Sequence, residues 1–219
     1  LLPAADYTIV ENWDVVGLKG TGSHDIVVDD VFVPEHRTHN GREDRGGLKF
    51  MHKAPLYRLP FMQVFSRAVS TPTLGAAQGA LEKFVELART RQSGPVPMRD
   101  DPSAKKLAAE VDSALARRRH ELLHDFDALM ARARAGESAA LKDRARYRHN
   151  TATVADECVA LSSRMLKAAG SSGIRNHSPL FQQHMDILAS QAHVANIADT
   201  FAVNHGGMLF GQDSTEFAL

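Results

Sequence analysis

Four long segments, in which apolar residues recur about every 3.6 positions, fill most of the chain after the first fifty residues. This spacing predicts helices over residues 62–92, 103–135, 138–169 and 179–204. The joints SGPVPMRDDP, Gly136 and GSSGIRNHSP each carry the Gly or Pro that ends a helix. Because the connections are short, consecutive helices are expected to run antiparallel. The sequence therefore predicts an antiparallel four-helix bundle.

The first fifty residues follow a different pattern. Between Tyr7 and Val33, two runs rich in Val and Ile, TIVENWDVVGL and HDIVVDDVFVP, flank the turn KGTG and predict β-strands. Partial alternation of apolar and acidic residues in DIVVDDVFV predicts one covered face and one wetter face. The expected fold class is α+β, with a partial antiparallel β-domain over residues 1–50 and a helical bundle domain over residues 51–219. Because a sheet of so few strands has open edges, we expect this sequence to be part of a longer protein that extends on the N-terminal side.

Charge and cysteine content narrow the functional classes. The 26 Lys and Arg residues balance 26 Asp and Glu residues, so the formal net charge is zero. No overall field then attracts nucleic acid or an anionic membrane surface, and neither is expected as a partner. The N-terminal sequence LLPAADYT lacks the features of a signal peptide. The single cysteine, Cys158, is expected to be a packing residue in a reducing compartment, which predicts a cytoplasmic protein.

Three local patterns occur in the order typical of one superfamily. NWDVVGLKGTGSHDIVVDDVFVPEHR, over residues 12–37, resembles the middle-domain segment of flavin-dependent hydroxylases. GAAQGALEKFVELARTRQSG, over residues 75–94, is similar to the first bundle helix of acyl-CoA dehydrogenases and their hydroxylase relatives. The segment over residues 169–196 is similar to the glycine-rich turn and last helix that close over the flavin. The chain thus resembles the C-terminal half of a two-component, flavin-dependent aromatic monooxygenase, such as p-hydroxyphenylacetate hydroxylase, in the acyl-CoA dehydrogenase-like superfamily.

The resemblance implies several flavin contacts. Arg91 corresponds to the arginine that reaches flavin phosphates, often those of a neighbouring subunit, and a guanidinium suits a bidentate phosphate contact. Thr21 and Ser23 correspond to a turn that lines the flavin or substrate pocket. A glycine-serine turn after the third predicted helix corresponds to a cradle for a phosphate or adenine. The residues of this turn are Gly170, Ser171, Ser172 and Gly173. A solvated arginine and ordinary tight turns are the alternative interpretations.

The last predicted helix carries the position that separates two chemistries. Common acyl-CoA dehydrogenases have a carboxylate there, shortly after an Arg-Asp pair, that takes a proton from the substrate carbon. With Asp186 aligned to that aspartate, the position is Val194, which abstracts nothing, and the arginine is replaced by Met185. His193 resembles the histidine that stands beside the flavin and the substrate hydroxyl in aromatic hydroxylases. We therefore expect His193 to act as the base or orienter of a phenol, although a boundary histidine bonded to the backbone is the alternative.

On a continuous helix, Ile187, Val194, Ala198 and Phe201 would share one apolar face, with His193 on its flank. The reaction that the resemblance implies begins when reduced FMN or FAD adds oxygen to give a C4a-hydroperoxide. Its distal oxygen then attacks an electron-rich aromatic ring. A separate flavin reductase would supply the reduced flavin, since no nicotinamide-binding βαβ unit occurs in the sequence. The family resemblance further implies a homotetramer. The alternatives are an acyl-CoA dehydrogenase and a non-catalytic helical interaction module.

The segment HELLH, over residues 120–124, matches the zinc metalloprotease pattern of two histidines one helical turn apart with a glutamate between them. Leu122 and Leu129 belong to the expected buried face of this helix, and His120 and His124 point away from it. The glycine and third histidine of the extended motif do not follow. A solvated helix face is the preferred interpretation, and no metal is expected.

Overall fold

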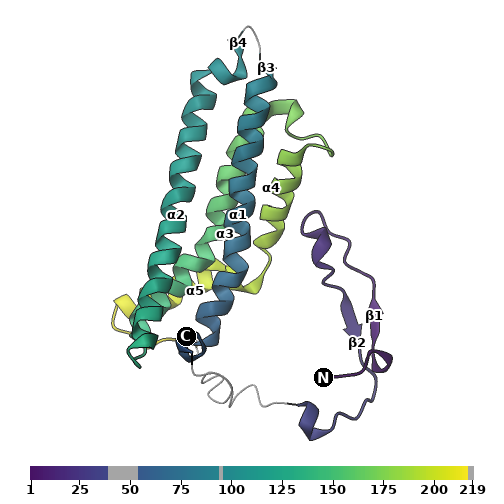
Figure 1. Cartoon of the computed structure of the whole chain (residues 1–219), viewed down its shortest axis with the longest axis vertical. Coiled ribbons are helices and arrows are strands. Elements are labelled where there is room, and N and C mark those ends of the chain that lie inside the picture. The colour runs from purple at the N-terminus through teal and green to yellow at the C-terminus, as the bar shows by residue number, and fades with distance from the viewer. Residues whose placement is uncertain (39–53, 94–95, 217–219) are drawn as a thin grey trace.

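The computed structural model describes residues 1–38, 54–93 and 96–216. Its long helices pack side by side and alternate in direction, and a shorter helix crosses one end of the bundle (Figure 1). The predicted antiparallel four-helix bundle is confirmed, with α1 packed against both α3 and α4. The helices are α1 (Phe61–Thr90), α2 (Pro102–Arg134), α3 (Leu141–Ala169), α4 (Pro179–Ser190) and the crossing helix α5 (Ala198–Leu209).

Local signals account for most helix boundaries. Asp101 caps α2, because its side chain accepts a hydrogen bond from the Ser103 amide at 2.8 Å. Ser178 caps α4 in the same way, and each helix has a proline in its first turn. The chain leaves α3 at Gly170, whose φ of 57° favours glycine. The short strands β3 (Gln92–Ser93) and β4 (Val96–Pro97) pair antiparallel between α1 and α2.

The fourth predicted helix is wrong in its second half. Instead of continuing to residue 204, α4 ends at Ser190, and α5 begins at Ala198 after an irregular turn. The side chain of Asn196 is buried in this turn and donates a hydrogen bond to the carbonyl of Ser190 at 2.8 Å. This bond satisfies one of the terminal carbonyls of α4, which would otherwise be paired by a continuing helix. The predicted shared apolar face does not form, since Ile187 is fully buried whereas Val194 is 66% exposed.

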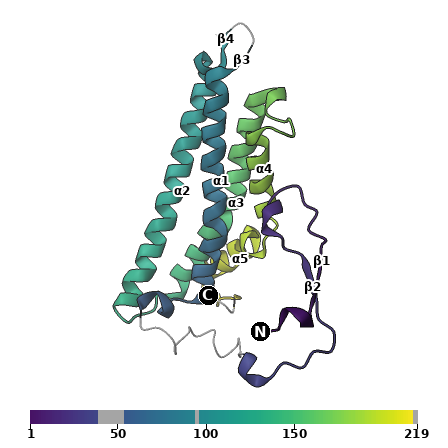
Figure 2. The same cartoon turned by 45° about the vertical axis from the view of Figure 1, so that its right-hand side comes forward.

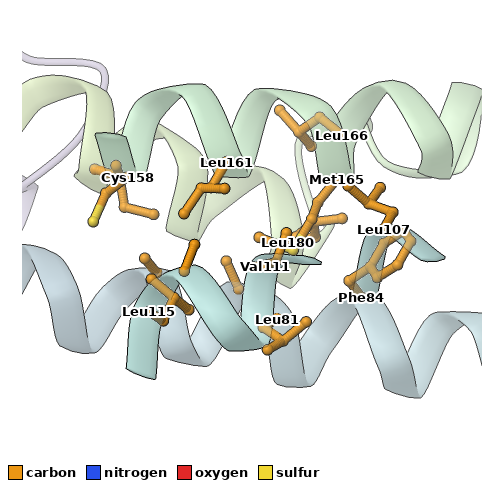
Figure 3. Packing of buried hydrophobic residues seen from close by; sticks show 14 of the residues in the cluster. Leu81, Phe84, Leu107, Val111, Leu115, Cys158, Leu161, Met165, Leu166 and Leu180 are labelled. Atoms are coloured by element: carbon orange, nitrogen blue, oxygen red, sulfur yellow. The ribbon is translucent and has the colours of Figure 1, made fainter. Parts of the chain in front are cut away.

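The main core lies between α1, α2, α3 and α4. Figure 3 shows Phe84 of α1, Val111 of α2 and Met165 of α3 converging with Leu180 of α4. Cys158 lies in the same cluster and is 1% exposed. Burial raises the pKa of its thiol to about 12, so it is an unreactive packing residue, as predicted. Removal of these apolar side chains from water stabilises the bundle.

The N-terminal segment forms a hairpin that stands beside α4 (Figures 1 and 2). Strand β1 (Thr8–Val10) pairs antiparallel with β2 (Asp25–Val27), and Ile9 lies opposite Ile26. All residues of both strands are exposed, so the predicted covered face is wrong for the hairpin within this chain. The side chains that would cover such a face do not come from the described part of the bundle, which the hairpin meets at a turn.

The predicted domain boundary between residues 50 and 51 lies outside the described residues. Among the helices that the structure describes, none has a stretch both long enough and apolar enough to cross a membrane.

Candidate functional site

Arg91 and the glycine-serine turn meet at the end of the bundle where α1 and α3 terminate. The Arg91 side chain donates a hydrogen bond from Nη1 to the carbonyl oxygen of Ala169, 78 residues along the chain. A Cβ atom added to Gly170 would lie 3.3 Å from Nη2 of Arg91. The structure thus brings together two candidate elements that the sequence analysis identified separately. It also gives the guanidinium a fixed anchor while leaving further N–H groups for an anion.

The turn itself is tightly packed at its glycines. Gly170 begins a single 3₁₀ turn that ends at Ser172, and the amide of Gly173 donates to the carbonyl of Gly170 at 2.9 Å. A Cβ on Gly173 would lie 2.7 Å from the Cβ of Ala169, so a larger residue does not fit. Ser171 is exposed and Ser172 is half-buried. Hydroxyl groups beside a fixed guanidinium are compatible with a phosphate ligand.

Thr21 and Ser23 lie in the turn of the N-terminal hairpin. Their hydroxyl oxygens are 3.2 Å apart, and that of Thr21 also donates to the carbonyl of Leu18 at 2.9 Å. Both side chains are exposed. Gly22, between them, has a φ of 56°. The turn therefore presents two adjacent, exposed hydroxyl groups that a bound molecule could contact.

A contact that the sequence analysis missed holds this turn against α4. The amide of Leu18 donates a hydrogen bond to the carboxylate of Asp186 at 2.6 Å. Next to it, a Cβ on Gly17 would lie only 2.0 Å from the carbonyl oxygen of Met185. Asp186, which lacks the neighbouring arginine of the resembled family, has a backbone amide as its partner. The replacement of that arginine by Met185 was the one available signal that Asp186 had a different partner.

His193 lies in the turn between α4 and α5 rather than within a helix. Its side chain is exposed, and its ring lies 5.7 Å from the ring of Phe65 on α1. The Nδ1 atom accepts a hydrogen bond from the amide of Ala195 at 3.0 Å. Because this bond occupies the lone pair of Nδ1, the neutral ring carries its proton on Nε2. The geometry thus presents an N–H donor at the outer edge of the ring.

The candidate residues fall into two groups at opposite ends of α4. Arg91 and the turn at residues 170–173 lie before the helix begins, whereas His193 follows its end. The 12 residues of α4 span about 18 Å at 1.5 Å per residue. Thr21 and Ser23 lie beside the C-terminal half of α4, because Asp186 in that half binds their turn. The structure does not bring Arg91 and His193 together within one chain.

The histidines of α2 and the histidine inside α4 lie outside these two groups. His120 and His124 are exposed on α2, and within the described ranges no three His, Cys, Asp or Glu residues are close enough to hold a metal ion. His184 is buried, and its Nδ1 atom lies 2.8 Å from the hydroxyl oxygen of Ser162. Burial lowers its pKa. This pair joins α4 to α3 inside the bundle and is part of the packing.

The comparisons with known proteins place this geometry in a family. A family model described as acyl-CoA dehydrogenase, C-terminal domain, matches residues 68–197, which is more than half of the chain. The flavin-dependent monooxygenase, oxygenase subunit HsaA, of Mycobacterium tuberculosis is 32% identical over 218 residues, which cover 96% of this chain and 55% of that protein. The indole-3-acetate monooxygenase of Pseudomonas putida is 34% identical, over 97% of this chain and 54% of that protein.

A solved structure gives the same result for the fold. The crystal structure of 3-HSA hydroxylase from Rhodococcus sp. RHA1 superposes with a TM-score of 0.90 at 30% identity, over 100% of this chain and 58% of that one. The chain therefore spans about half the length of these relatives. The family match runs from within α1 through the turn that carries His193. The chain belongs to the acyl-CoA dehydrogenase C-terminal domain family.

Proposed function

We propose that this chain is the C-terminal part of a monooxygenase that uses reduced FMN or FAD to hydroxylate a small phenolic substrate. The observation that carries the proposal is His193, which occupies the place next to the dehydrogenase carboxylate and presents Nε2–H to the outside. Val194, at the carboxylate position itself, has no group that accepts a proton. The names of the two relatives that match nearly the whole chain support the same class of reaction.

The residues present fit a flavin. Arg91 retains donor groups beyond the one bonded to Ala169, and the absence of a side chain at Gly170 leaves room for its guanidinium beside the turn. In this proposal, Arg91 and the turn at residues 170–173 bind phosphate, while Thr21 and Ser23 contact the flavin or the substrate. When bound, reduced flavin supplies the two electrons that let one atom of O₂ enter the ring while the other leaves as water. The overall balance is phenol, O₂ and reduced flavin going to hydroxylated phenol, water and oxidised flavin.

His193 orients the substrate rather than removing its proton. With Nδ1 occupied by the Ala195 amide, the neutral ring donates from Nε2 to the phenol or phenolate oxygen. A charge-stabilising donor at this position holds the electron-rich ring in place and favours the phenolate. To accept a proton at Nε2, the neutral ring would have to carry its proton on Nδ1, which would break the hydrogen bond from the Ala195 amide. Of the two roles predicted for His193, the geometry favours the orienter.

The remaining parts of the proposal concern partners and location. A separate reductase supplies the reduced flavin, and the protein is a cytoplasmic homotetramer. The separation of Arg91 from His193 along α4 supports an oligomer, since a phosphate bound at one end need not belong to the flavin beside His193 in the same subunit. The neutral net charge and the single buried cysteine support the location.

The test uses the purified protein with chemically reduced flavin, a phenol and ¹⁸O₂. We expect one ¹⁸O atom in the hydroxylated product, measured by mass spectrometry. His193→Asn keeps an acceptor for the Ala195 amide but removes the outer donor, whereas His193→Gln places an amide donor near Nε2. Product formation should fall about a hundredfold in the Asn variant and less in the Gln variant.

Other outcomes would identify the alternatives. Oxidation of an acyl-CoA thioester without oxygen uptake would indicate an acyl-CoA dehydrogenase. Failure to bind reduced flavin at all would favour a non-catalytic interaction module. Equal activity of the Asn variant and the unchanged protein would remove His193 from the mechanism.

A further inference from the structure

Arg148 is the largest fully buried side chain of the structure's described part, and it points at the turn that follows α4. It lies on α3, is 1% exposed, and donates a hydrogen bond from Nη1 to the carbonyl oxygen of Ala195 at 2.9 Å. A buried guanidinium is costly unless its surroundings compensate it. Such a residue in the bundle interior therefore calls for a specific role.

Ala195 connects Arg148 to His193. Its carbonyl oxygen accepts from Arg148, and its amide donates to Nδ1 of His193 at 3.0 Å. Ala195 is itself buried, at 1% exposed. One residue thus joins a rigid buried cation to an exposed imidazole. Any shift of its backbone would change the hydrogen bond that selects the tautomer of His193.

Two further side chains contact the guanidinium of Arg148. Its central carbon lies 3.5 Å from the ring centroid of Phe201 on α5, within the range of a cation–π contact. Its Nε lies 3.7 Å from a carboxylate oxygen of Glu216. Asn204 of α5 accepts hydrogen bonds from Thr215 and Ser214, and these bonds hold the segment that carries Glu216 against the bundle. Arg148 therefore has little freedom to move.

The charge of Arg148 persists at neutral pH. Burial lowers the pKa of its guanidinium to about 10, while Glu216 acts in the opposite direction and the nearby Arg67 lowers it further. Burial also raises the pKa of Glu216, and Arg148 lowers it. A charged donor makes a stronger hydrogen bond than a neutral one, so the bond to Ala195 is suited to fixing a backbone position.

We propose that Arg148 is a positioning residue for His193, which acts through Ala195 to keep Nδ1 as an acceptor and Nε2–H directed outward. Glu216 and Phe201 hold Arg148 in place. The effect of Arg148 on catalysis rests on the proposed function. The geometric part does not, because it concerns only the orientation and tautomer of a side chain.

The experiment is ¹⁵N NMR of the histidine rings in the purified protein at about pH 8, so that imidazoles are neutral. The His193→Asn spectrum identifies the His193 signals among the 11 histidines. We expect an unprotonated Nδ1 in the unchanged protein and an averaged tautomer signal in Arg148→Met. Arg148→Lys, which keeps a charged donor, should restore most of the original signal. Arg146→Met is the control, because Arg146 is exposed on the same helix and should leave the signal unchanged.

Glu216→Gln provides a second variant if Arg148→Met does not fold. It loosens Arg148 without removing it, and we expect a smaller change in the same direction. An unchanged His193 signal in a folded Arg148→Met protein, or in Glu216→Gln where the Met variant is unfolded, would overturn the inference.

Kinetics separate this inference from the proposed function. If both hold, kcat falls about tenfold in Arg148→Met with KM for the flavin unchanged, because the oriented group is displaced from the substrate. Arg148→Lys should recover part of the loss. A shifted NMR signal with unchanged kcat would overturn the catalytic part. Absence of hydroxylation in the unchanged protein, with the NMR result as expected, would overturn the proposed function but would still support the positioning of His193 by Arg148.

Discussion

At the scale of single residues, the candidate site depends on positions where the backbone excludes most side chains. Gly170 has a φ of 57° and a ψ of −148°, a region that residues with a Cβ rarely adopt. It also faces the guanidinium of Arg91. The same residue thus ends α3 and lies against the guanidinium that bonds to Ala169. A glycine-serine turn is common at helix ends, but here it also lies beside the arginine that the family resemblance assigns to the flavin phosphates.

Replacement of Gly170 by alanine should destabilise the protein and displace Arg91. The backbone strain costs about 1–3 kcal/mol, and the added Cβ would lie 3.3 Å from Nη2 of Arg91. We expect a lower free energy of unfolding in urea and, if Arg91 binds phosphate, weaker flavin binding. Gly206→Ala in α5 is the control, since its Cβ meets nothing within 4 Å and should be neutral or slightly stabilising. Equal stability of the Gly170 variant and the unchanged protein would contradict the assigned strain.

At the scale of elements, the hairpin turn packs so closely against α4 that no side chain fits at Gly17. Gly17 is buried against the backbone of Met185, and Leu18 donates to Asp186. A packed backbone contact with one hydrogen bond positions Thr21 and Ser23 relative to the turn of His193. Both strands of the hairpin are exposed, so this contact determines how the two parts of the described chain meet.

Gly17→Ala should separate the hairpin turn from α4 while the bundle stays folded. The new Cβ would be 2.0 Å from a carbonyl oxygen that cannot move without disrupting α4. The Leu18 amide should then exchange with deuterium faster, as measured by hydrogen exchange. Gly20→Ala, in the same turn, meets nothing within 4 Å and should show normal exchange. Asp186→Asn, which retains an acceptor oxygen, should protect the amide better than Asp186→Ala, and the reverse order would be inconsistent with the contact.

At the scale of the whole molecule, stability should fall in mild acid because His184 is buried and His205 is half-buried between helices. Burial lowers the pKa of His184 below its ordinary value of 6.5, and burial with nearby positive groups lowers that of His205. The unfolded state then binds protons more readily than the folded state. Their contribution is therefore fully present above about pH 6.5 and is lost as the pH falls through the folded pKa values.

The measurement is the free energy of unfolding between pH 7.5 and pH 5. His184→Asn, which keeps a polar partner for Ser162, should show a flatter dependence over this range. His177→Asn serves as the matched control because His177 is exposed. A His184→Asn curve with the same slope as the unchanged protein would argue against this source of acid sensitivity.

The sequence alone determined the features that depend on neighbours in the chain. The helix period, the caps at Asp101 and Ser178, and the glycine at the end of α3 are local signals, so the bundle followed from them. The family resemblance led to Arg91, His193 and the glycine-serine turn for the same reason, since each lies in a contiguous motif.

Only the tertiary structure decided how these pieces meet. The sequence QAHVANI contains neither Gly nor Pro, and the break after α4 comes from Asn196, which reaches back to Ser190, and from Arg148, which bonds to Ala195 from 47 residues away. The bond between Arg91 and Ala169 joins residues that are even farther apart in sequence, at 78 positions. Such contacts depend on the packing of whole helices against one another. No local pattern encodes them, and the contacts of Asn196 and Arg148 hold the turn in which His193 lies.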